Sequence, residues 1–422
     1  MKKVLIISPD YPPCNLAGVH RARLFAQHLP EFGWEPIVLC VDEKYYEFDL
    51  DWNLYKLLPK NQRIEKVKAF QVTKPRLIGD IGLRSYFFLR RKALQLIKND
   101  NIDFVYIPIP SFYVSLLGPY LNRKTGVKYG IDYIDPWVHQ FPGSEKIFSR
   151  HWWSTRFAKW LEPKAVEKVS LITGVASGYY QGVIERNPHL SSTCLFGAMP
   201  YGGEKNDQLL LSELGIEPYL FKKNNKIQLV YAGAMLPKAY APLRSIFHSL
   251  ANNIDLFKNV EFHFIGTGKI PNDPNSYTIK PIAEEYGIWQ TNIFEYPKRI
   301  SYLDVLVHLN AATAIFILGS TEPHYTPSKV YQAVLSQKPV FAVLHKQSTA
   351  GSILQKSKAG QVLSFDGEND LGSINQRFAI FFSDFINFIN EFDPALIDET
   401  MFEEYSAKSV TGKLSALLNQ VT

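Results

Sequence analysis

The chain alternates between short apolar runs and longer stretches whose apolar residues recur at helical spacing. In the first half, the apolar runs expected to form strands are residues 2–8, 35–41, 102–109, 127–134 and 170–177. Helical spacing follows some of these runs, for example over residues 18–29 and 110–121. Such alternation predicts βαβ units around a parallel sheet.

A second alternating series begins after residues 198–207, a polar stretch rich in glycine and proline that we interpret as a linker. The strands expected in this half are residues 226–233, 259–268, 292–296, 312–319 and 339–344. The fold class predicted is therefore α/β, with two doubly wound, Rossmann-like domains facing each other across a cleft. We place these domains at residues 1–200 and 208–400, and we expect the amphipathic helix at 401–422 to return to the first domain.

Composition narrows the class of protein. The 422 residues are 46% hydrophobic and 20% charged, which is typical of a soluble globular protein. A net charge of +6 is compatible with an anionic substrate or membrane surface, and it does not by itself indicate nucleic-acid binding. The three cysteines have no disulfide or zinc spacing.

Two observations bear on location. The apolar run at the start is too short for a signal peptide, and we interpret it as the first strand. No apolar run approaches the roughly 20 residues of a membrane span. We expect a cytoplasmic protein, with peripheral contact at the inner face of the membrane left open.

Residues 324–344 contain an expected helix whose start is suited to an anion. Thr326 and Pro327 fit an N-cap and a first helical position, so Ser328 and Lys329 would lie in the first turn. Free N–H groups and the helix dipole favour an anion there, and a lysine beside it makes sense if that anion binds. The alternative is a solvated lysine on a surface helix.

Glycine loops follow other expected strands. In the first half, Gly18 precedes a helix that carries Arg21 and Arg23, a combination that suits a phosphate or an anionic acceptor. In the second half, Gly233 is followed by Lys238, and Gly266 lies in a further strand-end loop. Neither a Walker motif nor a dinucleotide fingerprint is present, so plain βα turns remain the alternative.

Polar residues also follow the expected strand at residues 127–134. Asp135, Trp137 and His139 would lie at its carboxyl end, where a carboxylate can orient or deprotonate a sugar hydroxyl. The alternative is an ordinary Asp-Pro turn. The sequence shows no metal-ligand motif, and we expect no metal site.

Two segments, residues 84–98 and 151–168, mix basic and aromatic residues. This composition suits helices that contact an anionic membrane surface. Partly buried helices with solvated charges are the alternative.

The order of these motifs resembles the retaining glycosyltransferases of family 4, which have the GT-B fold. The resemblance spans nearly the whole chain and is carried by SPDYPPCNLAGVHRARLFAQHLPEFGWEPIVL, YIDPW, MPYGGEKND, LVYAGAM, FHFIGTG and residues 324–344. It implies a hexosyltransferase that uses a nucleotide-diphosphate sugar, most often of UDP or GDP, with retention and without a metal or other cofactor. The acceptor implied is a glycan or a polyprenyl- or other lipid-linked molecule.

The resemblance also assigns roles to residues, with the donor in the second domain and the acceptor mainly in the first. The catalytic residues implied are Asp135, Lys238 and Lys329. The donor residues implied are Gly18, Gly233, Gly266, Tyr296, Glu322, Ser328 and Gln332. The acceptor residues implied are Arg21, Arg23, Trp137 and His139.

The chain departs from the family pattern at three positions. Two glutamates that the family often carries eight residues apart fall on His324 and Gln332, with Glu322 nearby. Ile134 stands where related sequences often have arginine before Asp-Pro-Trp. Two other functions therefore stay open: nucleotide-sugar epimerisation or hydrolysis on the same fold, and non-catalytic nucleotide-sugar binding.

Overall fold

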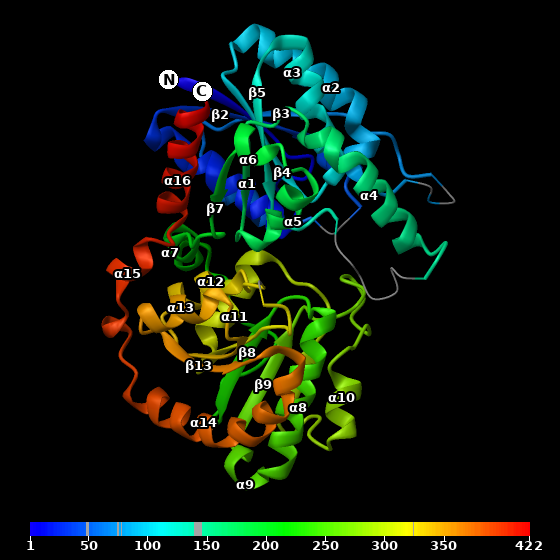
Figure 1. Ribbon diagram of the computed structural model, residues 1–422. Helices are drawn as coiled ribbons and strands as arrows, with labels where there is room; N and C mark the ends of the chain where they lie inside the picture. The colour runs from blue at the N-terminus through cyan, green and yellow to red at the C-terminus, as the bar shows by residue number, and fades with distance from the viewer. Residues whose placement is uncertain (48–49, 74–75, 77, 139–145, 324) are drawn as a thin grey trace. The chain divides into compact units, whose positions relative to one another are not determined.

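The computed structural model describes residues 1–47, 50–73, 76, 78–138, 146–323 and 325–422. The chain forms two compact units. Unit 1 contains Met1–Gly202 and Ala407–Thr422, and unit 2 contains Gly203–Ser406. Each unit is built around one parallel sheet (Figure 1).

Unit 1 has a seven-stranded sheet in the order β3-β2-β1-β4-β5-β6-β7. Its strands are β1 (Lys2–Ile7), β2 (Trp34–Val41), β3 (Arg63–Val67), β4 (Phe104–Ile109), β5 (Lys128–Tyr133), β6 (Leu171–Gly174) and β7 (Leu195–Ala198). Its helices are α1 (Ala17–His28), α2 (Ile81–Asp100), α3 (Leu117–Thr125), α4 (Arg150–Val166), α5 (Gly178–Arg186), α6 (Leu190–Thr193) and α16 (Ala407–Val421). The order reverses between β1 and β4, so the loops after these two strands flank the switch point at which such sheets bind ligands.

Helices cover both faces of this sheet. Helices α2, α3, α4 and α5 share one hydrophobic core with it, and α1 and α16 share the other. The C-terminal helix α16 packs against α1, and Lys408 forms an ion pair with Glu31 at 2.7 Å. A helix from the end of the chain thus completes the layer that covers the first strands.

Unit 2 has a six-stranded sheet in the order β10-β9-β8-β11-β12-β13. Its strands are β8 (Ile227–Ala232), β9 (Val260–Ile265), β10 (Ile293–Tyr296), β11 (Ala314–Leu318), β12 (Val340–His345) and β13 (Gly360–Phe365). Its helices are α7 (Lys205–Leu214), α8 (Tyr240–Asn252), α9 (Ile254–Phe257), α10 (Lys280–Glu285), α11 (Tyr302–Ala311), α12 (Lys329–Leu335), α13 (Thr349–Lys356), α14 (Leu371–Glu391) and α15 (Glu399–Glu403). Here the order reverses between β8 and β11, which are paired in parallel.

The apolar pattern explains why the strands form. Both faces of each sheet are covered, so central strands such as β4 and β12 are buried along their whole length and read as continuous apolar runs. The region between β2 and β4 contains β3 and the twenty-residue helix α2, which Asp80 caps by accepting a hydrogen bond from the Leu83 N–H. The expected pair of doubly wound α/β domains is confirmed.

Candidate functional site

The switch point of unit 2 gathers several of the residues expected to bind a donor. Lys238 lies in the 3-10 turn Pro237–Ala239 after β8, and Glu322 lies in the loop after the adjacent strand β11. The Lys238 Nζ is 3.7 Å from a Glu322 carboxylate oxygen, and the Thr321 N–H donates to the Lys238 carbonyl at 3.2 Å. The two loops are thereby held side by side. An exposed ion pair of this kind contributes at most about 1 kcal/mol, so Lys238 can exchange its partner for a phosphate at low cost.

Lys329 differs from Lys238 in its surroundings. Its Nζ lies 5.8 Å from the centre of the Tyr302 ring, and no carboxylate pairs with it in the part of the chain that the structure describes. Burial, together with the nearby Arg299, lowers the pKa of Lys329 to about 8. A desolvated ammonium without a carboxylate partner gains more from an approaching anion than an already paired one does.

Helix α12 begins two residues later than the sequence suggests. Ser328 is the N-cap, and its side chain makes no capping hydrogen bond. The Thr326 hydroxyl instead bonds the Thr349 hydroxyl at 2.7 Å, so the expected Thr326 cap is wrong. Gln332 lies one turn after Lys329, and its Oε1 atom is buried with no hydrogen-bond partner among the described residues.

The glycines of unit 2 lie where the backbone turns away from a strand. Gly233 follows β8 with φ 140°, and a side chain there would meet no atom within 4 Å. Gly266 follows β9 with φ 72°, and its N–H donates to the Tyr296 carbonyl at 2.8 Å. Both positions favour glycine because other residues rarely adopt such backbone angles.

The Tyr296 ring, at the end of β10, contacts His263. Its hydroxyl lies 3.3 Å from His263 Nδ1, and the two rings stack with centroids 6.1 Å apart. Burial raises the pKa of Tyr296 to about 12. The side chain packs on β9 and β10 and is half-buried, and the expectation that it contacts the donor stays a prediction.

A residue that the sequence did not single out, Glu295, fixes the loop after β9. Its buried carboxylate accepts hydrogen bonds from the Thr267 hydroxyl at 2.7 Å and from the N–H groups of Thr278, Ile279 and Lys280 at 2.8–3.0 Å. The only signal for it in the sequence is an acidic residue inside the apolar strand NIFEY. Glu295 ties the loop that begins at Gly266 to the start of α10.

In unit 1, Arg21 and Arg23 have a different role from the one expected. Arg21 is fully buried and donates to both oxygens of Asp132 at 2.5 and 2.9 Å, and also to the carbonyls of Met199 and Pro200. Arg23 is also buried, with 1% of its surface exposed. These side chains stabilise the interior of unit 1, and their expected contact with an acceptor is corrected.

The other residues expected to contact an acceptor differ in their surroundings. Trp137 is buried, and its ring stacks on Phe112 with centroids 5.8 Å apart, so it belongs to the core and the expectation that it contacts an acceptor is wrong. His139 lies outside the described residues. Asp135 follows β5; the residue is exposed as a whole, but the protein around its carboxyl partly desolvates that group and raises its pKa to about 6. Gly18 sits where a side chain would reach Ile134 at 3.4 Å.

Two further carboxylates lie near the switch point of unit 1. Asp10 follows β1, and burial, with the charge of Asp80, raises the pKa of Asp10 to about 7. Asp80 accepts a hydrogen bond from the Ser111 hydroxyl at 3.3 Å, and Ser111 follows β4. This polar group was missed because Asp10 stands in a proline-rich turn in the sequence. Carboxylates and hydroxyls at this edge suit a polyhydroxylated ligand.

Comparison with solved structures identifies the fold. HepE of Anabaena, crystallised with UDP-glucose, is 12% identical, with a TM-score of 0.62 and coverage of 100% of both chains. A glycosyltransferase of Rickettsia africae ESF-5 is 13% identical, with a TM-score of 0.61 and coverage of 100% of this chain and 98% of that one. Sucrose-phosphate synthase of Thermosynechococcus elongatus is 12% identical, with a TM-score of 0.60 and coverage of 100% and 99%.

The chain has the GT-B fold. The alignment over its full length confirms the fold that the motif order suggested. No protein-family model matches the sequence, and no curated protein matches it.

Two features are absent from the described residues. No helix there is long and apolar enough to cross a bilayer. No group of three or more histidine, cysteine, aspartate or glutamate side chains there is arranged to hold a metal ion.

The lowered pKa of Lys329 leads to a prediction about pH. Below pH 8 the side chain is charged, and above it the charge is lost, while a nucleoside diphosphate is fully ionised throughout this range. We expect the affinity for UDP to fall by up to about tenfold between pH 8 and pH 9. Titration calorimetry measures this directly. Lys329→Arg, whose guanidinium stays charged, should have a flat profile over the same range, whereas a flat profile in the unaltered protein would contradict the assignment.

Proposed function

We propose that this chain is a glycosyltransferase that moves a sugar from a nucleotide-sugar donor to a glycan or lipid-linked acceptor. The observation that carries the proposal is the GT-B fold over the full length, with Lys238 paired to Glu322 at the switch point of unit 2 and Lys329 at the start of α12 in the same unit. HepE of Anabaena, which shares this fold, was crystallised with UDP-glucose. UDP is therefore the first nucleotide to test, and GDP is the second.

In this proposal, the diphosphate of the donor lies between Lys238 and Lys329. When the sugar leaves, negative charge develops on the diphosphate, and two cations placed beforehand stabilise that charge. The sugar is transferred with retention of configuration, and the lysines supply the positive charge that the leaving group needs. Gly233 and Gly266 allow the backbone to approach the donor closely.

The acceptor binds to unit 1, at the ends of β1, β4 and β5. Asp135 orients an acceptor hydroxyl, and the carboxylates of Asp10 and Asp80 accept hydrogen bonds from others. We place the protein in the cytoplasm, in peripheral contact with the inner face of the membrane when the acceptor is lipid-linked.

Incubation with a panel of UDP- and GDP-sugars and candidate acceptors tests the proposal. Mass spectrometry should detect a glycosylated acceptor together with an equal amount of free nucleoside diphosphate. An isomerised sugar without acceptor would mean an epimerase, and release of free sugar would mean a hydrolase. Binding without any turnover across the panel would mean a non-catalytic binding protein.

Gln332 supplies a separate prediction for the donor side. It lies three residues after Lys329 on the same face of α12, and we propose that its amide bonds the ribose hydroxyls. We expect Gln332→Ala to raise the donor KM about threefold to tenfold with little change in kcat, because one uncharged hydrogen bond is lost. Gln332→Glu should bind at least as well, since a carboxylate is the stronger acceptor.

The matched control is Gln355→Ala, which removes an exposed glutamine from the neighbouring helix α13. Its donor KM should equal that of the unaltered protein. If Gln332→Ala also keeps the original KM, the ribose lies elsewhere.

A further inference from the structure

Helix α4 presents an aromatic face to solvent. Trp153, Phe157 and Trp160 are 45%, 48% and 60% exposed, and their spacing places them along one side of the helix. The opposite side, with Ala158 and Ala165, is buried in the core of unit 1. Large aromatic side chains in such a row are normally covered when a protein is in its working state.

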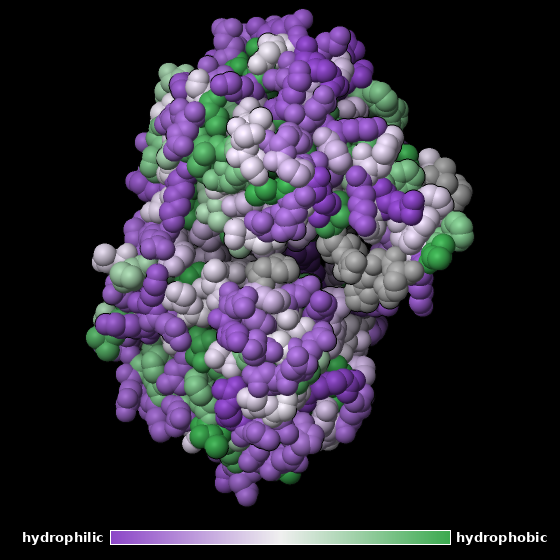
Figure 2. All heavy atoms as spheres, in the orientation of Figure 1, coloured by the Kyte–Doolittle hydropathy of each residue, from purple (hydrophilic) through white to green (hydrophobic). Residues whose placement is uncertain are grey.

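The chain that leads into α4 extends this apolar surface. Ile147 and Phe148 are 69% and 74% exposed, and they directly precede the helix. A few apolar atoms are visible near this end of α4, at the right-hand edge of the view in Figure 2. We call Ile147, Phe148, Trp153, Phe157 and Trp160 the α4 face. The ring centres of Phe148 and Trp153 lie 6.2 Å apart, and those of Trp153 and Phe157 lie 6.1 Å apart, so these side chains are neighbours on the surface.

The segment that carries the α4 face is basic. The sequence from residue 146 to 161 contains four lysines and arginines and no acidic residue. The Arg156 guanidinium lies 4.7 Å from the centre of the Trp152 ring, and the Lys164 Nζ lies 3.5 Å from that of Trp160. Lysine and arginine side chains on an apolar surface keep their stems on it while their charged ends reach toward polar or anionic groups.

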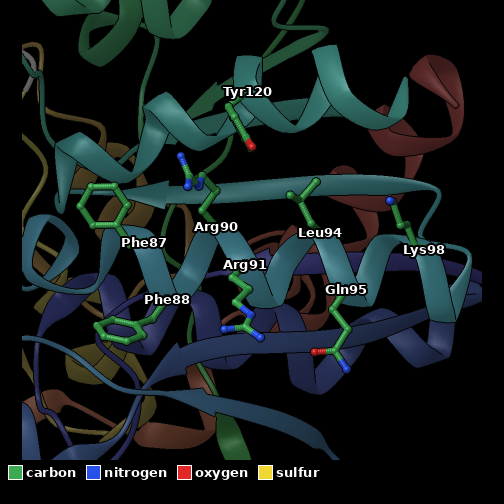
Figure 3. A pocket seen from close by; sticks show the side chains of 8 residues that line it. All are labelled: Phe87, Phe88, Arg90, Arg91, Leu94, Gln95, Lys98 and Tyr120. Atoms are coloured by element: carbon green, nitrogen blue, oxygen red, sulfur yellow. The ribbon is translucent and has the colours of Figure 1, made fainter.

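A groove along α2 has the same character. It has a volume of about 570 Å³ and is lined by Phe87, Arg90, Arg91, Lys98 and, from α3, Tyr120 (Figure 3). The Arg90 guanidinium lies 5.4 Å from the centre of the Phe87 ring and 5.0 Å from that of Tyr120. Helices α2, α3 and α4 share one core and cover the same face of the sheet, so the groove and the α4 face belong to one side of unit 1.

We propose that unit 1 docks on an anionic bilayer, with the α4 face entering the headgroup region and the arginines of the α2 groove binding lipid phosphates. Tryptophan with flanking cations is the combination that binds the interface of an anionic membrane. A second copy of this chain fits the surface poorly, because a two-fold contact would bring the cations of each copy against one another. The inference names the surface for the membrane contact put forward above, and in that respect it rests on the proposed function.

Co-sedimentation with vesicles tests the inference. At low salt, the protein should bind vesicles of phosphatidylcholine that contain about 30% phosphatidylglycerol. It should bind vesicles of pure phosphatidylcholine much more weakly. Changing Trp153, Phe157 and Trp160 together to alanine should lower the bound fraction at least tenfold. Arg90→Ala and Arg91→Ala should each lower affinity about fivefold, because each removes one cation from the anionic surface.

Trp52→Ala is the matched control, since Trp52 is 57% exposed in the same unit but lies outside α4. It should bind vesicles as the unaltered protein does. Brominated lipids should quench tryptophan fluorescence on binding, and much less so in the triple variant. Trp52, Arg91 and the three aromatic residues are exposed and Arg90 is half-buried, and circular dichroism should show unchanged folding for every variant.

Three results would overturn the inference. The first is no binding to anionic vesicles at low salt, and the second is binding by the triple variant equal to that of the unaltered protein. The third is a dimer in solution that the triple variant fails to form, because a second copy of the chain would then cover the α4 face. UDP binding by the triple variant should be unchanged. A failure of membrane docking is thereby distinguished from a failure of the proposed donor site.

Discussion

Replacing Lys238 or Lys329 with alanine is expected to lower kcat about 10²- to 10³-fold for each variant, while the protein stays folded. Each lysine is expected to face the diphosphate as the sugar leaves, and the loss of one group that stabilises developing charge typically costs about 2.7–4 kcal/mol. Steady-state kinetics with the donor found by the nucleotide-sugar panel measures the effect. Thermal unfolding of the same variants shows whether the fold is intact.

Lys226→Ala is the matched control for these two variants. Lys226 also forms an ion pair, at 3.0 Å with Glu261, but it precedes β8 and so lies at the opposite end of that strand from Lys238. Its removal should leave kcat unchanged. Full activity in both Lys238→Ala and Lys329→Ala would mean that the diphosphate does not bind at this edge of the sheet.

Replacing Arg21 with alanine is expected to destabilise unit 1 by about 3–5 kcal/mol, because it leaves the buried Asp132 carboxylate without its partner. Asp132→Ala should have a similar effect, and the two changes together should cost less than their sum, since both remove the same interaction. Urea unfolding followed by circular dichroism measures the loss.

Arg91→Ala, which removes an exposed arginine from α2, is the control and should leave stability unchanged. UDP binding by folded Arg21→Ala should also be unchanged, since Arg21 lies in unit 1. If Arg21→Ala has normal stability but an altered acceptor KM, Arg21 contacts the acceptor after all.

The β/α alternation was readable from the sequence because the central strands are buried on both faces. Strand β12, for example, is buried from Val340 to His345, and its sequence is therefore a continuous apolar run that predicts a strand. The turns at Gly233 and Gly266 could also be predicted from the sequence, because residues other than glycine rarely adopt their positive φ angles. These features depend on neighbouring residues alone.

The features that the sequence misassigned depend on contacts between distant residues. Arg21 looked like an acceptor contact because it stands in the first turns of a helix after a glycine loop, yet its partner Asp132 is 111 positions away. Whether a charged or aromatic side chain reaches solvent or a buried partner is decided by packing, which local pattern does not specify.

The same reasoning explains why Glu295 and Asp10 were overlooked. Glu295 collects hydrogen bonds from a loop 15 to 28 residues earlier in the chain, and Asp10 meets Asp80 only once β1 and α2 are in place. An acidic residue in an apolar strand, or after one, is the available signal. In both cases that signal becomes informative only when the sheet order is known.

Titration calorimetry with UDP and GDP is the most direct test of the central claim, that the edge of unit 2 with Lys238 and Lys329 binds the diphosphate of a nucleotide-sugar donor. We predict saturable binding of at least one of the two nucleotides at one site per chain. Affinity should fall about tenfold or more in both Lys238→Ala and Lys329→Ala and should be unchanged in Lys226→Ala. Absence of binding to both nucleotides, or equal affinity in all three variants, would contradict the account.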